Sequence, residues 1–211
     1  MRVGVLVSGT GTILEALLAD DVPVVLVAAD RGCRALEVAA SAGIRTALVD
    51  RHQYGGFAPG FDRRGYTNAL VDVLRDAQLD LVVMAGFGTV VAQSMHDAYA
   101  GRILNTHPAL LPAFPGWHAV EEALAAGVTV TGCTVHIATI DMDAGPVLAQ
   151  EEVPVVPGDT AATLHERIKE VERRLYPATI RRVLERLAAG GTAEEAASPP
   201  VRLAHSEESR S

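Results

Sequence analysis

The stretch MRVGVLVSGTGT, residues 1–12, decides the fold of this chain. Its near-continuous apolar run over Val3–Val7 predicts a strand that is buried on both faces. Two glycines then allow a tight turn, after which Thr12–Ala19 is a helix candidate. A helix that begins directly after such a turn presents free backbone N–H groups and a positive dipole end to an anion. The stretch therefore predicts a strand–turn–helix unit of an α/β fold, with an anion site at the turn.

We expect this turn to bind a single phosphate monoester at Gly11, Thr12 and Ile13. A dinucleotide-binding turn carries a third glycine, which would fall where this chain has Leu14. Asp30, near the end of the second apolar run, keeps a dinucleotide site as an alternative, because an acid at that place can hold a ribose. A tight turn without a ligand is the other alternative.

The same alternation continues through the first hundred residues. Short runs rich in Val and Leu predict buried strands at Val22–Ala28, Thr46–Val49 and Leu79–Met84. Helices are predicted between them, over Arg34–Ala42 and Arg63–Ala77. Strand–helix repetition at this rhythm indicates an α/β, Rossmann-like, doubly wound and mostly parallel sheet.

The second half has a different pattern and predicts an antiparallel C-terminal strand pair and a long C-terminal helix. A cap at Asp159 or Thr160 begins that helix, and Pro177 is expected to kink or interrupt it. The composition from Ala189 onward predicts a poorly ordered tail over residues 189–211. The other predicted elements are strands over Arg102–His107, Val128–Ala138 and Pro146–Val153 and a helix over Trp117–Ala126.

Length, charge and cysteine content narrow the function classes. A chain of 211 residues forms about one domain, and its net charge of −8 disfavours a nucleic-acid partner held through its phosphates. Cys33 and Cys133 are too few for a disulfide scaffold or a Cys-rich zinc site. Apolar runs are too short for a membrane span or a signal peptide. We therefore expect a soluble cytoplasmic protein without a nucleic-acid or membrane partner.

Asn105 and His107 are candidate catalytic residues. In an extended segment, residues two apart share a face, so these two side chains project together while Thr106 points away. A carboxamide beside an imidazole can stabilise an oxyanion. Three prolines between positions 108 and 115 stiffen the loop that follows, which suits an accurately aimed side chain. A structural hydrogen-bonding histidine is the alternative.

Asp143 and His136 are further candidates. Asp143 lies in the turn DMDAGP (141–146), where small residues let a carboxylate approach a ligand closely; an ordinary solvated turn is the alternative. Thr134 and His136 share one face of a predicted strand, and a structural and a catalytic role remain equally open for that histidine. The spacing of His107, His118 and His136 matches no standard zinc pattern, so we expect no metal.

Six motifs in a fixed order are more specific than any one of them. They are SGTGT (8–12), AGF (85–87), ILNTHPALLP (103–112), FPG (114–116), GCTVH (132–136) and DAGP (143–146). Together they resemble the phosphoribosylglycinamide formyltransferase (glycinamide ribonucleotide transformylase) family of folate-dependent formyltransferases. The resemblance runs from residue 1 to about residue 185.

The resemblance implies transfer of a formyl group from 10-formyltetrahydrofolate, as co-substrate, to the amine of 5'-phosphoribosylglycinamide in de novo purine biosynthesis. It implies neither a metal nor NAD. Asn105, His107 and Asp143 would be the catalytic set. It further implies substrate contacts at Gly11, Thr12, Ile13 and Glu172, and folate contacts at Arg63, Gly88, Thr89, Val90, Val91 and Asn105, with Arg64 as the alternative to Arg63.

Two departures from the family pattern concern the substrate sites. Ile13 stands where the family usually has asparagine, so backbone contacts to phosphate survive and a side-chain contact is lost. Gly88 and Thr89 stand where the pterin segment normally has methionine and arginine. We expect the smaller side chains to widen the folate pocket or to weaken folate binding.

We expect a single formyltransferase domain over residues 1–188, with a phosphate-binding half at 1–100 and a catalytic, folate-binding half at 101–188. The expected partners are small-molecule substrates only, and the expected state is a monomer or a homodimer. Three alternatives remain: formyltetrahydrofolate deformylase, a formyltransferase for another amine, and a non-catalytic nucleotide-binding module. Deformylases carry an additional N-terminal regulatory domain, for which a glycine loop at Ser8 leaves no room.

Overall fold

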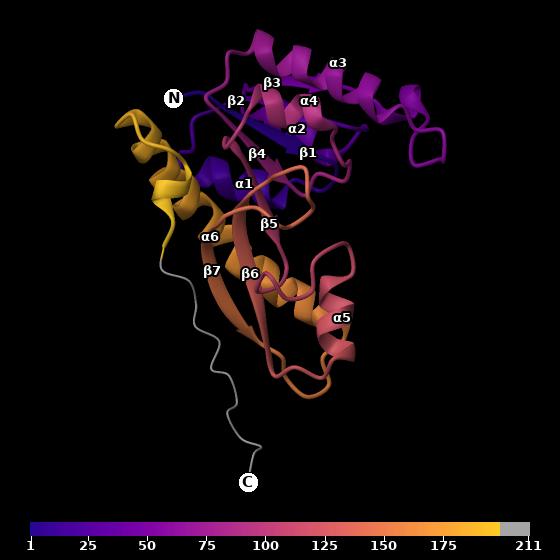
Figure 1. The fold of residues 1–211 in the computed structure, drawn as a ribbon, viewed down its shortest axis with the longest axis vertical. Coiled ribbons are helices and arrows are strands. Elements are labelled where there is room, and N and C mark those ends of the chain that lie inside the picture. The colour runs from indigo at the N-terminus through magenta and orange to yellow at the C-terminus, as the bar shows by residue number, and fades with distance from the viewer. Residues whose placement is uncertain (199–211) are drawn as a thin grey trace.

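The computed structural model describes residues 1–198, and residues 199–211 lie outside the described part of the chain. Seven strands form one sheet in the order β3-β2-β1-β4-β5-β6-β7 (Figure 1). Neighbouring strands from β3 to β5 are parallel, whereas β6 is antiparallel to both of its neighbours. The strands are β1 (Val3–Val7), β2 (Val24–Ala29), β3 (Arg45–Leu48), β4 (Leu81–Ala85), β5 (Ile103–His107), β6 (Val130–Ile137) and β7 (Val147–Pro154).

Helices cover both faces of the sheet, as the doubly wound prediction requires. Buried residues of α1, α2 and α6 pack on one face, and those of α3 and α4 pack on the other. The fold class is thus confirmed, and the predicted elements lie within a residue or two of their expected ends. The helices are α1 (Thr12–Ala19), α2 (Arg34–Ser41), α3 (Arg63–Asp76), α4 (Gln93–Ala98), α5 (Ala119–Ala125) and α6 (Ala161–Ala188), with short 3₁₀ turns η1 (Arg51–Tyr54) and η2 (Glu194–Ala196).

The order of the strands determines where a crevice opens at the edge of the sheet. The chain runs outward from β1 through β2 to β3 and then returns to β4 on the other side of β1. At such a switch point the loops after neighbouring strands separate and leave a crevice at the carboxyl ends of the strands. The loops after β1 and β4 therefore face a shared opening.

The long helix α6 continues through Pro177 and is not interrupted there, contrary to one of the two outcomes expected from the sequence. Tyr176 and Ile180 on the same stretch are fully buried against the sheet. The Tyr176 hydroxyl also lies 2.8 Å from the carbonyl oxygen of Leu104 in β5, to which it donates. Packing on the sheet thus holds the helix together across the proline, whose missing N–H removes one helical hydrogen bond.

The tail prediction is wrong for its first part. Residues 189–198 contain η2, and Ala193 is buried in the core beside α6. The N–H of Ser198 donates to the carbonyl oxygen of Leu148 in β7. Glu195 of η2 also pairs with Arg186 of α6. These contacts together anchor a segment whose composition is typical of a linker. The remainder of the predicted tail, residues 199–211, lies outside the described residues.

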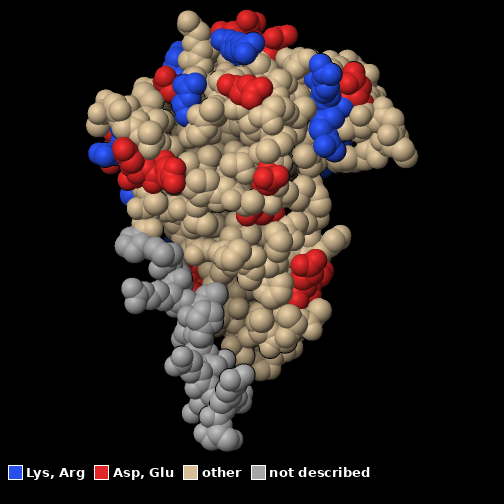
Figure 2. All heavy atoms as spheres, viewed as in Figure 1, with Lys and Arg blue, Asp and Glu red and all other residues tan. Residues whose placement is uncertain are grey.

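Charged side chains of both signs are interspersed on the face that Figure 2 shows, mainly over the N-terminal half. Within residues 1–198, no helix combines the length and the apolar character that a membrane crossing requires.

Candidate active site

A cleft of about 590 Å³ opens at the carboxyl ends of β1, β4 and β5. Its walls come from the turn after β1, the loop after β4, the loop between β6 and β7, and one side of α6. Almost all of the site residues predicted from the sequence line this cleft: Gly11, Thr12, Ile13, Gly88, Thr89, Val90, Val91, Asn105, His107, Asp143 and Glu172.

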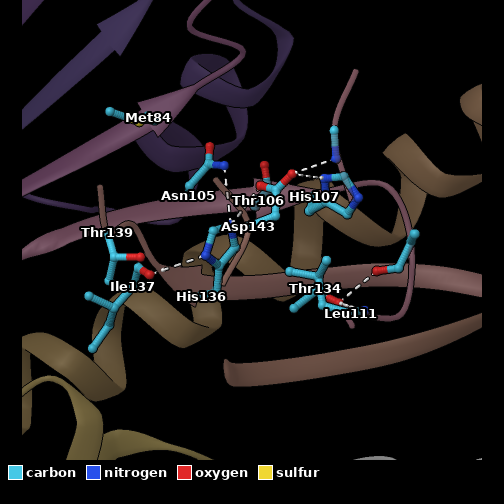
Figure 3. Close-up of polar contacts among 12 residues, drawn as sticks. Met84, Asn105, Thr106, His107, Leu111, Thr134, His136, Ile137, Thr139 and Asp143 are labelled. Carbon is cyan, nitrogen blue, oxygen red and sulfur yellow. Dashed lines mark hydrogen bonds and ion pairs between the residues drawn. The ribbon is translucent and has the colours of Figure 1, made fainter. Parts of the chain in front are cut away.

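The antiparallel pairing of β5 with β6 brings the amide of Asn105 to the ring of His136. The register sets Asn105 directly opposite His136, and side chains opposite one another on two strands share a face. The amide Nδ2 of Asn105 lies 3.2 Å from Nε2 of His136 (Figure 3). On the other side of the ring, Nδ1 of His136 lies 3.2 Å from the carbonyl oxygen of Ile137.

These contacts assign the proton on His136. A carbonyl oxygen can only accept, so Nδ1 carries the hydrogen and Nε2 accepts from the Asn105 amide. Burial lowers the pKa of His136, although the Ile137 carbonyl and the charge of Asp143 act in the opposite direction. The ring is therefore neutral and holds the Asn105 amide in place, with the second amide hydrogen left for a ligand.

His107 is held from both sides. Its Nε2 donates to the carbonyl oxygen of Phe114, at 2.6 Å, and its Nδ1 lies 3.4 Å from a carboxylate oxygen of Asp143. Because Nε2 is occupied by an acceptor, any further proton of the ring resides on Nδ1. The side chains of His107 and Asp143 are only 5% and 7% exposed, and both residues line the cleft. Figure 3 shows the Asp143 carboxylate against the His107 ring.

Asp143 is fixed by contacts from two other segments, the loop after β5 and strand β6. The N–H of Gly116 donates to its carboxylate at 2.8 Å, and the other carboxylate oxygen lies 3.6 Å from Nε2 of His136. Its backbone has φ of 55°, and Phe114, which anchors His107, has φ of 52°. Non-glycine residues in this left-handed region are uncommon and concentrate at functional sites.

The turn after β1 lines one part of the cleft, and its backbone has the strand–turn–helix geometry expected from the sequence. Gly11 has φ of 82° and directly precedes α1, so the free N–H groups of Thr12 and Ile13 belong to the first turn of that helix. Two side chains of α6, His165 and Lys169, line the same cleft. An ammonium group and a helix N-terminus in one cleft form a suitable anion site.

Glu172 faces the cleft from α6 and accepts a hydrogen bond from the hydroxyl of Thr106. Burial raises the pKa of Glu172, and the Thr106 hydrogen bond opposes that shift. Thr106 thus points away from Asn105 and His107, as the strand alternation predicts, and meets the long helix instead.

Arg63 lies outside the main cleft. It lines a smaller recess with Phe57 and Phe61, and the two cavities share Gly88, Val90 and Trp117. The predicted ligand contact of Arg63 therefore belongs to this smaller recess, which we call the annex, rather than to the floor of the main cleft.

Sequence reasoning missed three contributors to the site. The carbonyl of Phe114 and the N–H of Gly116 act through the backbone, so no residue type signals their roles. Lys169 lies three residues before Glu172 on α6, and helical spacing puts these two residues on one face, a signal that was available.

Comparison with known proteins identifies the family. Residues 1–180 match the family model described as "Formyl transferase". The chain belongs to this family.

Three similar proteins align with 85–92% of this chain. The phosphoribosylglycinamide formyltransferase of Mycobacterium tuberculosis (strain ATCC 25618 / H37Rv) is 47% identical over 184 residues, which are 85% of this chain and 83% of that protein. The human trifunctional purine biosynthetic protein adenosine-3 is 39% identical over 92% of this chain, which spans only 19% of that longer protein. The crystal structure of glycinamide ribonucleotide transformylase 1 from Symbiobacterium toebii matches with a TM-score of 0.80 and 40% identity, over 90% of this chain and 88% of that one.

These similarities confirm the predicted family, the formyltransferase fold and the enzyme class. A formyltransferase of this family uses a folate-derived formyl donor. The roles of individual residues and the oligomeric state stay predictions.

Proposed function

We propose that this chain transfers the formyl group of 10-formyltetrahydrofolate to the primary amine of 5'-phosphoribosylglycinamide, a cytoplasmic step of purine biosynthesis. The observation that carries the proposal is the convergence of Asn105, His107, His136 and Asp143 in a cleft that the turn before α1 also lines. One cleft thus combines a phosphate site with groups suited to acyl transfer.

Asn105 stabilises the oxyanion. When the amine nitrogen attacks the formyl carbon, a C–N bond forms and the carbonyl electron pair moves onto oxygen. The Asn105 amide, already held by Nε2 of His136, directs its second N–H at that oxygen. A donor oriented before the reaction costs no reorganisation in the transition state.

His107 is the general acid. Its Nε2–H donates a hydrogen bond to the carbonyl oxygen of Phe114. The proton available for catalysis is therefore the one on Nδ1, the nitrogen that faces Asp143. When the intermediate collapses, the bond from carbon to N10 of the folate breaks and its electron pair takes that proton. Asp143, directly or through a water, accepts the proton that the attacking amine loses. The mechanism uses neither a metal nor NAD.

The ribonucleotide spans the cleft from its phosphate end to the floor. Its phosphate contacts the N–H groups at Gly11, Thr12 and Ile13, and the ammonium of Lys169 balances the charge. Glu172 then lies within the same cleft for the ribose or the amine. The folate occupies the side lined by Gly88, Thr89, Val90 and Val91, with its tail toward Arg63.

Product analysis tests this proposal. Purified protein is incubated with 10-formyltetrahydrofolate, with and without 5'-phosphoribosylglycinamide, and tetrahydrofolate and formylated ribonucleotide are quantified. We expect the two products in equal amounts and only when the ribonucleotide is present. Tetrahydrofolate and free formate in its absence would instead identify a deformylase.

A further inference from the structure

A buried ion pair lies beneath the folate side of the cleft. Asp30, at the end of β2, is fully buried, and Arg51 of η1 is 4% exposed. The guanidinium Nη1 of Arg51 donates to the Asp30 carboxylate at 2.8 Å. The hydroxyl of Thr89 donates to the same carboxylate oxygen at 2.6 Å, and Thr89 is itself only 3% exposed. The Thr89 side chain therefore points into the protein, although its backbone lines the cleft.

The loop after β4, residues 86–91, touches this network at two points. Thr89 is bonded to Asp30, and a Cβ built on Gly88 would lie 3.7 Å from Nη1 of Arg51. The guanidinium thus lies directly against the loop from below. The same guanidinium stacks on the ring of Phe57, 3.8 Å from its centre, and Phe57 lines the annex beside Arg63. One buried cation therefore supports both the loop and the aromatic wall of the annex.

Stability alone does not account for this arrangement. Within residues 1–198, two buried polar atoms of the ion pair have no hydrogen-bond partner: Asp30 Oδ1 and Arg51 Nε. A buried ion pair with unfilled hydrogen-bonding positions contributes little to the free energy of unfolding, because desolvation offsets its Coulombic attraction. Buried ionic groups are retained in some proteins because they specify one geometry.

We propose that Asp30, Arg51 and Thr89 are positioning residues that hold the loop 86–91 in the shape that binds the formyl donor. The inference rests on the proposed function, since it assigns the folate to this side of the cleft. It also accounts for the sequence departure at this loop: the short side chain of Thr89 turns inward, and Arg51 supplies the guanidinium beneath the loop from another element. The network affects donor affinity and leaves the chemistry at Asn105 and His107 unchanged.

Variants of Thr89 test the proposal. Removing Asp30 or Arg51 would leave the other as a buried unpaired charge, which is strongly destabilising. T89V removes only the hydroxyl, whereas T89S keeps it. T179V is the matched control, because Thr179 is also fully buried, donates to the Leu175 carbonyl and does not line the cleft.

For T89V we expect the KM for 10-formyltetrahydrofolate to rise about tenfold, the factor that ~1.4 kcal/mol corresponds to. The KM for the ribonucleotide and kcat should stay within about twofold, and T89S and T179V should match the unmodified protein. An unchanged donor KM in T89V, or equal effects on both substrates and on kcat, would overturn the proposal.

A binding measurement separates this inference from the proposed function. The Kd for tetrahydrofolate is measured by calorimetry on the same variants, without turnover. Weaker binding by T89V than by T89S supports the positioning role even if the unmodified protein transfers no formyl group to the ribonucleotide. Equal tetrahydrofolate affinity in all variants, or no binding by the unmodified protein, contradicts it.

Discussion

At the residue scale, the chemistry depends on which nitrogen of each histidine carries a proton. His136 accepts from Asn105 through Nε2 and donates through Nδ1 to a carbonyl, so it serves as a neutral orienting group. His107 has the reverse arrangement, with Nε2–H bound to a carbonyl and Nδ1 facing Asp143. Two histidines in one cleft thus take different roles because their backbone partners differ.

Asp143→Asn tests the charge at the floor of the cleft. The amide oxygen of asparagine still accepts from the Gly116 N–H, so the loop keeps its shape, but the negative charge facing His107 is lost. We expect kcat to fall at least ~10-fold with little change in Tm, because the proton acceptor is removed. Asp141→Asn, an exposed acid in the same turn, is the control and should keep full activity. Equal kcat values for the two variants would refute the assignment to Asp143.

The pH dependence of stability tests the neutral state of His136. Burial lowers its pKa in the folded protein, so below about pH 6.5 the unfolded chain binds more protons than the folded one. The free energy of unfolding therefore falls as the pH decreases from this value. His136→Gln keeps an acceptor for Asn105 but does not titrate, so urea unfolding between about pH 6.5 and 5 should show a shallower decline. An identical decline in both proteins would mean that His136 does not contribute.

At the scale of elements, the site depends on turns that place backbone groups. Gly11 shows this most directly: its φ is 82°, and a Cβ there would lie 2.9 Å from the Cα of Ala35 in α2. Neither the left-handed backbone nor the close approach tolerates a side chain without a shift. The turn at Gly11 is therefore held between β1 and α2 as well as by its own helix.

Gly11→Ala should raise the KM for 5'-phosphoribosylglycinamide by ~10-fold or more and leave the KM for the formyl donor nearly unchanged. The left-handed backbone alone costs ~1–2 kcal/mol for a residue with a Cβ. Gly158→Ala provides the matched control, since Gly158 has φ of 89° but open space around its Cβ position and lies outside the cleft. If both variants bind the ribonucleotide equally well, the turn does not hold the phosphate.

Hydrophobic patterning predicts much of the secondary structure, whereas parts of the site depend on contacts that only the folded chain makes. Short apolar runs predicted the position of every strand, because strands that are buried on both faces require such composition. The predicted burial was wrong for β3, which lies at the edge of the sheet and is mostly exposed. The pairing of Asn105 with His136 depends on the β5–β6 register, which only the folded sheet sets. The packing of residues 189–198 was missed, since it rests on small alanines, backbone hydrogen bonds and an Arg186–Glu195 ion pair, none of which stands out from a linker-like composition. Thr89 was expected to contact folate, but its hydroxyl faces Asp30, a buried partner far away in sequence.

At the scale of the whole molecule, the net charge of −8 coexists with an anionic substrate. A small ligand in a cleft responds to nearby dipoles and to Lys169 more than to distant surface charges, which salt screens. The cleft joins both halves of the chain, because its walls come from loops of the parallel strands and from β6, β7 and α6. Ligands that bridge these walls should stabilise the entire fold.

Thermal unfolding measures that stabilisation. At a ligand concentration 100 times its Kd, binding adds ~2.7 kcal/mol to the free energy of unfolding. For a chain of this length we expect Tm to rise by about 5–10 °C with 5'-phosphoribosylglycinamide or with tetrahydrofolate. NAD serves as the comparison and should leave Tm unchanged. A rise with NAD and none with the other two ligands would favour a nucleotide-binding module.

The central claim is that an amide, an imidazole and a carboxylate from distant parts of the chain act on one carbonyl carbon. The kcat of Asn105→Ala, measured with both substrates saturating, tests it most directly. Loss of one oxyanion donor typically lowers kcat by ~10²–10³, and we predict a decrease in this range with an unchanged circular dichroism spectrum and Tm. A folded Asn105→Ala protein with kcat within about threefold of the unmodified enzyme would contradict the account.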